Sequence, residues 1–184
     1  NPENIPAGTL VKTGDNLIVN GSFETNLTAN RTWSVFNSVD GWRTTSGNGI
    51  EIQEGVAGGA ADGSSLVELD SHGNSGMQQV VATEAGQKYE ISVQYSPRPG
   101  VPAASNGVEV WWNGNKIDTL VGDGVGLRDT QWRTLSYQVD GNGAQGTLEF
   151  RAIGTNDSLG GYIDNVQMFR LVTPASLQTG NDNI

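Results

Sequence analysis

The sequence of 184 residues contains no cysteine, and its 10 basic residues are outnumbered by 20 acidic ones. Without cysteine there is no disulfide and no thiolate metal site. The formal net charge of −10 would repel the phosphates of a nucleic acid and an anionic membrane surface, so neither is expected as a partner. No apolar run approaches the ~18 residues of a membrane-spanning helix, and we expect no membrane insertion.

Sustained helical patterns are also missing, whereas glycine is abundant, with 26 residues. Short segments recur in which apolar and polar side chains alternate, as in strands with one buried face. They cover residues 50–53, 88–95, 108–112, 116–120, 133–139 and 147–152. Asn113-Gly114 between two of them is typical of a tight β-hairpin. The sequence therefore predicts an all-β fold, an antiparallel β-sandwich.

The two ends of the chain lack this alternation. We predict an N-terminal arm or linker over residues 1–15, the sandwich over residues 16–172, and a C-terminal linker over residues 173–184. Such a chain is expected to be a monomeric module excised from a longer one. A secreted domain without disulfides needs another means of stabilisation, and an acidic surface suits a hard cation such as Ca²⁺.

Four of the tryptophans, Trp33, Trp42, Trp112 and Trp132, are predicted to pack in the core or against a strand. Trp111 differs, because the alternation places it with Glu109 on the polar face of its strand. From there its ring would either stack on a ligand or pack beneath a loop.

Two segments near the ends of the sandwich carry the first resemblance. Residues 16–24, which end in Gly21-Ser22-Phe23-Glu24, and residues 161–166, which include Ile163-Asp164-Asn165, resemble the signatures of galactose-binding-like jelly rolls. That fold class includes several carbohydrate-binding module families. The resemblance implies a structural Ca²⁺ between the first and last strands, held by Glu24, Asp164 and a carbonyl near Ser22. The alternative is that both carboxylates are ordinary turn residues.

A second constellation lies in residues 68–76, where Asp70, Ser71, His72 and Asn74 are interspersed with glycine. Oxygen-bearing residues at alternate positions allow a loop to curl around an ion. The segment is not an EF-hand, since Val81 stands where the glutamate would be. The single histidine is too few for a zinc site.

Two further loops contain candidate ligand-binding residues. Pro97 and Pro99 hold the backbone rigid around Arg98, whose guanidinium suits a carboxylate. The alternative is a solvated arginine. Asp157 is either a Ca²⁺ ligand or an Asx-turn former.

Together these segments resemble modules of very large bacterial RTX adhesins over residues 16–171. The resemblance implies secretion to the bacterial cell surface and Ca²⁺ as cofactor. Some such modules are lectins for surface glycans; others bind the free carboxyl terminus of a protein through Ca²⁺, and the resemblance to the second kind is the closer one. It implies a ligand site formed by Asp70, Ser71, His72, Asn74, Arg98 and Asp157, with Asp70 and Asp157 also binding Ca²⁺. Trp111 is a further candidate on the polar face.

No catalytic motif stands out: a phosphate-binding loop, a nucleophilic serine elbow and a zinc motif are all missing from the sequence. The chain is therefore not expected to be an enzyme. Two alternatives remain open. One is a glycoside hydrolase or lyase that uses two of the strand glutamates, Glu51, Glu68, Glu109 and Glu149. The other is an adhesin spacer that binds Ca²⁺ but no ligand.

Overall fold

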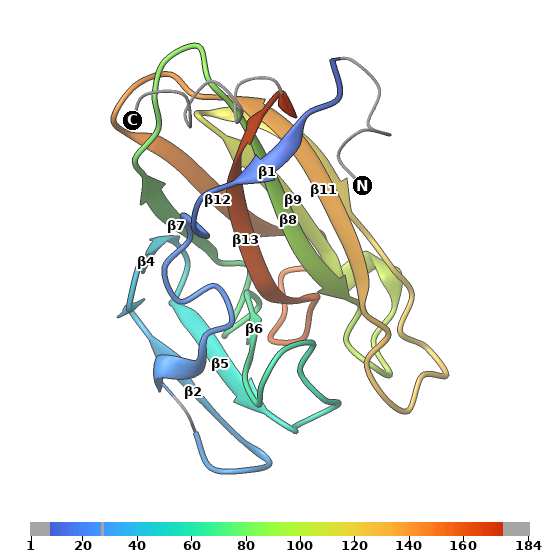
Figure 1. Ribbon diagram of the computed structural model, residues 1–184. Helices are drawn as coiled ribbons and strands as arrows, with labels where there is room; N and C mark the ends of the chain where they lie inside the picture. The colour runs from blue at the N-terminus through green and yellow to red at the C-terminus, as the bar shows by residue number, and fades with distance from the viewer. Residues whose placement is uncertain (1–7, 27, 175–184) are drawn as a thin grey trace.

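The computed structural model describes residues 8–26 and 28–174, which form two antiparallel sheets packed face to face (Figure 1). The first sheet contains β1 (Val11–Thr13), β2 (Thr32–Phe36), β5 (Ile50–Glu54), β6 (Leu66–Glu68), β8 (Lys88–Ser96), β11 (Arg133–Asp140) and β13 (Tyr162–Val172). The second contains β3 (Ser38–Val39), β4 (Trp42–Ser46), β7 (Gly76–Val81), β9 (Gly107–Trp112), β10 (Asn115–Leu120) and β12 (Gly146–Ile153). Two 3₁₀ turns, η2 (Glu24–Asn26) and η3 (Ala103–Ser105), lie in the connections.

The strand order brings distant parts of the chain together. In the first sheet it is β11-β8-β13-β6-β5-β2, with β1 paired to β13; in the second it is β10-β9-β12-β7-β4-β3. Strand β1 falls inside the predicted N-terminal arm. Most of the predicted C-terminal linker lies outside the described residues.

The segments predicted as strands are strands, and the alternation sets which side chains enter the core. In β8 the side chains of Tyr89, Ile91, Val93 and Tyr95 are all buried. At the predicted hairpin Asn113 and Gly114 have φ values of 50° and 79°, as a type I′ turn requires. The antiparallel sandwich predicted from the sequence is confirmed.

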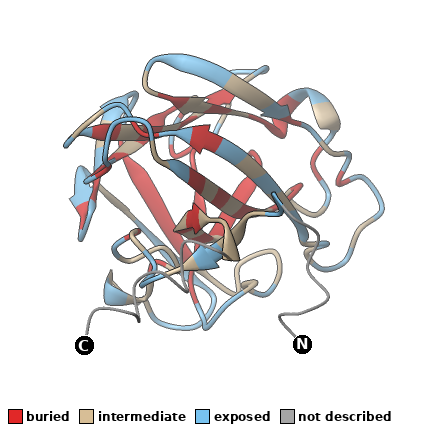
Figure 2. Cartoon of the chain, turned by 45° about the horizontal axis from the view of Figure 1, so that its top comes forward, coloured by how far each residue is buried: buried red, intermediate tan, exposed pale blue. Residues whose placement is uncertain are grey.

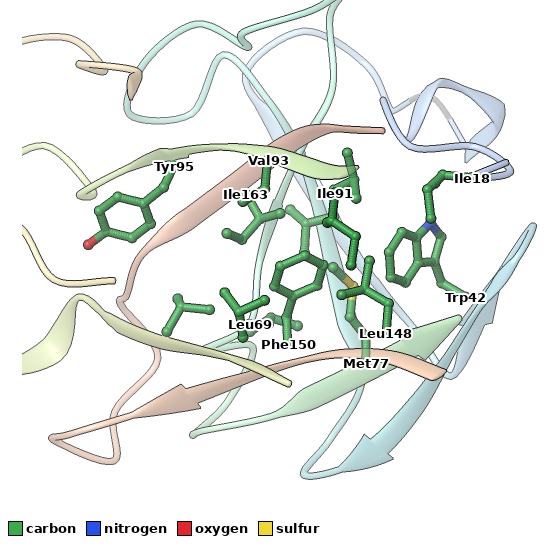
Figure 3. Close-up of a cluster of buried hydrophobic side chains, with 14 of the residues drawn as sticks. Ile18, Trp42, Leu69, Met77, Ile91, Val93, Tyr95, Leu148, Phe150 and Ile163 are labelled. Atoms are coloured by element: carbon green, nitrogen blue, oxygen red, sulfur yellow. The ribbon is translucent and has the colours of Figure 1, made fainter. Parts of the chain in front are cut away.

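The core fills the space between the sheets (Figures 2 and 3). Trp42 lies 5.5 Å from Phe23 and 6.0 Å from Phe150, measured between ring centroids. Trp42 and Trp112 are buried, as predicted. The other two candidates, Trp33 and Trp132, do not lie in the core.

Trp33 is 50% exposed because it stands opposite Gln53 on the outer face of the first sheet, on β2, the last strand of that sheet. Trp132 is only partly buried, since it precedes β11 and donates its indole N–H to the carbonyl oxygen of Gly59 in a surface loop.

The outer face of the first sheet is also partly covered. Ile50 and Ile52 of β5 face the core, yet the alternating Glu51 and Gln53 on the other face are only 4% and 1% exposed. Tyr162 of β13 is buried on this face as well. Polar side chains that would normally face water are therefore enclosed here, and this is where the candidate site lies.

Candidate functional site

The loop after β6 contains a buried carboxylate without a partner. Asp70 is 1% exposed, and neither of its carboxylate oxygens has a hydrogen-bond partner. The buried Oδ1 of Asn74, which forms an isolated β-bridge with Asp70, also has none. Buried polar atoms normally have partners, so three unpartnered oxygens in one short loop mark this loop as a candidate ligand site.

The chain brings further oxygen atoms to Asp70. A Cβ atom on Gly160 would lie 2.4 Å from Asp70 Oδ2 and 2.8 Å from the carbonyl oxygen of Ser105. Only glycine therefore allows the loop before β13 to pass this close. Asp157 in the same loop accepts hydrogen bonds from the Ser105 hydroxyl and the Leu159 N–H. We call Asp70, Asn74 and Asp157 the Asp70 cluster.

The electrostatics of the Asp70 cluster favour a cation. Burial raises the pKa of Asp70 to about 8, and the nearby negative charge of Asp157 adds to the rise. A divalent cation would offset both effects by replacing lost hydration and cancelling the repulsion. Carboxylate, amide and carbonyl oxygens are the ligands that Ca²⁺ prefers. The donor set at Asp70 fits that ion.

Carboxylates alone do not complete a metal site in this protein. Within residues 8–26 and 28–174, no three His, Cys, Asp or Glu side chains are grouped so that they could hold a metal ion. At the Asp70 cluster, amide and backbone oxygens would have to supply part of the coordination shell.

A cavity of about 320 Å³ adjoins the Asp70 cluster. Ser71 and His72 line it directly after Asp70, and Ser158 lines it directly after Asp157. Arg98 lines it as well. The structure thus brings the predicted residues Ser71, His72 and Arg98 to one cavity, with Asp70, Asn74 and Asp157 in the loops beside it.

Arg98 is held in place by its loop and by a buried acid. Its backbone N–H donates to Asn106 Oδ1 over 3.0 Å, and its Nη1 pairs with the fully buried Glu68. Burial raises the pKa of Glu68 to about 9, although the charge of Arg98 opposes that rise. Arg98 is therefore a positioned cation, partly neutralised before any ligand arrives.

Glu51 and Glu68 are brought together, which the sequence did not reveal. Gln53 Nε2 donates to both carboxylates, while the Tyr162 hydroxyl donates to Gln53 Oε1 over 2.8 Å. Burial also raises the pKa of Glu51. Because Glu68 is fully buried and paired with Arg98, it is not placed to attack a glycosidic bond.

Six residues that line the cavity were not predicted as site residues: Trp33, Glu51, Gln53, Val56, Ser158 and Leu159. Of these, Glu51 had been considered only as a candidate catalytic acid. A weak signal exists in β2, where Trp33 stands between two polar residues, Thr32 and Ser34. Nothing in the sequence shows that the edge strand meets the loops after β6 and before β13.

The predicted structural Ca²⁺ site has a different character. Asp164 is fully buried and accepts hydrogen bonds from the backbone N–H groups of Ala61, Asp62 and Asn165. Glu24 accepts from Ser64 and Ser65, and the Ser22 hydroxyl donates to Asp62. We call Glu24, Asp62 and Asp164 the Asp164 cluster.

Glu24 and Asp164 both bond to the loop before β6, which contains Asp62, but these acids, all within the described residues, are not grouped closely enough to hold a metal ion by themselves. Burial raises the pKa of Asp164 to about 7, while the backbone donors oppose the rise. Unlike Asp70, this carboxylate has donors on both of its oxygens.

Trp111 lies apart from this site, on β9 in the second sheet. The Arg151 guanidinium stacks over its ring at 4.0 Å, and its indole N–H donates to Glu109. Trp111 pairs with Glu149 across the strands. Trp111, Glu109 and Glu149 are therefore separate from the cavity, and the face of Trp111 below Arg151 is covered.

The chain is similar in sequence to parts of two large proteins. It is 30% identical over 169 residues, 90% of its length, to the multifunctional-autoprocessing repeats-in-toxin protein of Vibrio cholerae serotype O1 (strain ATCC 39315 / El Tor Inaba N16961). It is 29% identical over 154 residues, 82% of its length, to the protein of the same description from Vibrio vulnificus. The chain spans 3% of the length of each. No protein-family model matches it.

Solved structures with this fold include binding domains. A family 16 carbohydrate-binding module has a TM-score of 0.54 at 19% identity, over 83% of this chain and 99% of the other. The K2 cleaved adhesin domain of Lys-gingipain has a TM-score of 0.51 at 14% identity, over 87% and 99%. These structural similarities confirm the jelly-roll fold, and the Vibrio matches confirm the predicted resemblance to segments of RTX proteins. No helix in the described part of the chain has the length and apolar character to cross a membrane.

Proposed function

We propose that this chain, similar to segments of repeats-in-toxin proteins, is a non-catalytic adhesin module that binds the free carboxyl terminus of a peptide through Ca²⁺. In this proposal it acts as a monomeric module within a longer secreted chain at the bacterial surface. Its ligand is a protein on another cell. The proposal rests mainly on one observation. The buried Asp70 carboxylate has no hydrogen-bond partner, and the loop that contains it adjoins a cavity lined by Arg98.

The chemistry follows from the charges. Asp70 and Asp157 would balance one Ca²⁺, and Asn74 Oδ1 would add a neutral ligand. Ca²⁺ takes roughly six to eight oxygens, so coordination positions remain for an incoming carboxylate. Arg98 would attract the same carboxylate, but Glu68 already partly neutralises it. The ion therefore contributes most of the affinity, and Arg98 less.

We propose a second, structural Ca²⁺ at the Asp164 cluster. Glu24 near the start of the sandwich and Asp164 near its end meet at one loop, and Ser22 contacts that loop through Asp62. A cation there would reduce the repulsion between the acids. Its role would be to secure the loop, and no ligand would contact it.

The test uses an array of peptides that end in each of the common amino acids, each made with a free or an amidated carboxyl terminus. We expect binding only to free termini, only with millimolar Ca²⁺ and not in EGTA. Amidation removes both a metal bond and a charge-assisted hydrogen bond, the latter worth roughly 1.5–3 kcal/mol. Arg98→Ala should weaken binding without abolishing it. Equal binding of free and amidated peptides would reject carboxylate capture.

A glycan is the alternative ligand. Neighbouring sugar hydroxyls can fill the same coordination positions, and one solved structure with this fold is named a carbohydrate-binding module. A neutral sugar would gain little from Arg98. If a monosaccharide competes and no peptide binds, the glycan replaces the peptide. Loss of that sugar binding in Trp111→Ala, with Asp70→Asn unaffected, would place it on the second sheet.

A further inference from the structure

The cavity beside the Asp70 cluster has an exposed rim and a buried floor. Trp33 and Leu159 at the rim are 50% and 40% exposed, whereas Glu51 and Gln53 are only 4% and 1% exposed. A ligand group that reaches Glu51 must therefore be long and narrow. At about 320 Å³, the cavity has room for one extended side chain.

The floor carries an acid that lacks a cation of its own. Glu68 pairs with Arg98, but Glu51 forms no ion pair among the residues that the structure describes. Its hydrogen-bond donor there is the neutral amide of Gln53. Burying a carboxylate without an opposite charge is costly, so a ligand cation at Glu51 would be favoured.

The wall of the cavity suits the same kind of group. The Trp33 ring meets the His72 ring edge-on, with centroids 6.2 Å apart, and it lines the cavity together with Val56 and Leu159. Aliphatic stems pack well on such surfaces, and cations are attracted to an indole face.

The charge balance supports the same conclusion. Ca²⁺ would neutralise Asp70 and Asp157, and Arg98 can neutralise only one of the two buried acids, Glu51 and Glu68. The other acid, when ionised, and the ligand carboxylate then have no compensating charge. The whole chain carries a formal charge of −10. A peptide with a positive charge near its carboxyl end would reduce the repulsion inside the cavity and also its repulsion from the negatively charged chain as a whole.

We infer that the captured peptide carries a lysine or arginine close to its carboxyl terminus, whose stem lies along Trp33 and Leu159 and whose charge meets Glu51. This inference rests on the proposed function, because the carboxylate on Ca²⁺ directs the side chain into the cavity. It adds a specificity site that metal coordination alone does not supply.

The test uses peptides with free carboxyl termini that differ at one position. Lysine, norleucine, tyrosine and glutamate are placed in turn at each of the last four positions. Calorimetry with saturating Ca²⁺ measures the dissociation constants. At one position we expect lysine to bind about tenfold more tightly than norleucine and glutamate to bind most weakly.

Two variants and one control locate the effect. Glu51→Gln should erase the preference for lysine over norleucine, and Trp33→Leu should weaken the binding of the lysine peptide. Glu54→Gln removes the same charge from the same strand, but on the alternate face and outside the cavity, so it should retain the preference. Thermal melts of each variant verify folding.

The outcomes separate this inference from the proposed function. If lysine has no advantage at any position, or norleucine or tyrosine binds more tightly, the inference is wrong. It is equally wrong if Glu51→Gln keeps the lysine preference. In those cases sensitivity to amidation would still support carboxylate capture. If free and amidated peptides bind alike, or none binds, both proposals fail.

Discussion

The Asp164 cluster and the Asp70 cluster each contain a buried aspartate on or next to a strand of the first sheet, yet the two carboxylates differ in their hydrogen-bond partners. Asp164 accepts three backbone N–H groups, whereas Asp70 accepts none from any described group. A carboxylate that accepts backbone hydrogen bonds stabilises the loop that donates them. A buried carboxylate that accepts none destabilises the fold, and a bound cation can offset that loss. The same residue type therefore bonds to a loop at one cluster and lacks any described partner at the other, where we propose that Ca²⁺ binds.

The largest expected effect on stability is at the Asp164 cluster. Asp164→Asn places an amide N–H₂ against backbone N–H donors, so the free energy of unfolding should fall by about 1–3 kcal/mol for each donor left unpaired. Urea denaturation in EGTA measures it. Asp15→Asn, at an exposed position, is the control and should change little. If Asp164→Asn has the same free energy of unfolding as the parent, the hydrogen bonds from the backbone to Asp164 do not stabilise the loop.

The same substitution at the other cluster should act in the opposite direction. In EGTA, Asp70→Asn removes a buried acid whose ionisation is unfavourable in the folded state, and it should leave stability equal to or above that of the parent. It should also remove the ion's stabilisation, which for the parent is about 2.7 kcal/mol at a hundredfold excess of Ca²⁺ over its dissociation constant. Paired melts with EGTA and Ca²⁺ measure both effects. If Asp70→Asn is less stable than the parent in EGTA, or if Ca²⁺ raises its melting temperature as much as the parent's, the proposed difference between the two clusters is wrong.

The smallest effect concerns pH. The pKa of Asp70 is raised from 3.8 to about 8, so between these values the metal-free folded state keeps a proton that the unfolded state has lost. Stability in EGTA should therefore fall as pH rises from about 4 to about 8. Glu68 and Asp164, with pKa values raised to about 9 and about 7, contribute in the same direction.

The variant Asp70→Asn shows how much of this pH dependence of stability comes from Asp70. Urea midpoints at pH 5, 6, 7 and 8 should decline less steeply for Asp70→Asn than for the parent, while Asp15→Asn should follow the parent. Saturating Ca²⁺ should flatten the parent's decline, because the ion stabilises the ionised carboxylate. Identical slopes for Asp70→Asn and the parent would show that Asp70 is not held in its neutral form.

Much of the fold could be predicted because alternation is a local property. The burial of Tyr89, Ile91, Val93 and Tyr95 follows from period two along one strand. Trp33 does not lie in the core, because the register of β2 against β5 places it opposite Gln53 on the outer face, at the edge of the sheet. Strand order is a property of the whole chain, and no short pattern encodes it.

The sequence by itself determined the strands, the hairpin at Asn113-Gly114 and the acidic loops that contain Asp70 and Asp157. Only the tertiary structure decided which acids meet. It placed Glu51 beside Glu68, gave Asp164 its backbone donors, left Asp70 without any, and set Trp111 apart in the second sheet. The physical reason is that partnership and burial arise from residues far apart in the chain, as between Glu68 and Gly160, which only the packing of loops onto the sheet brings together.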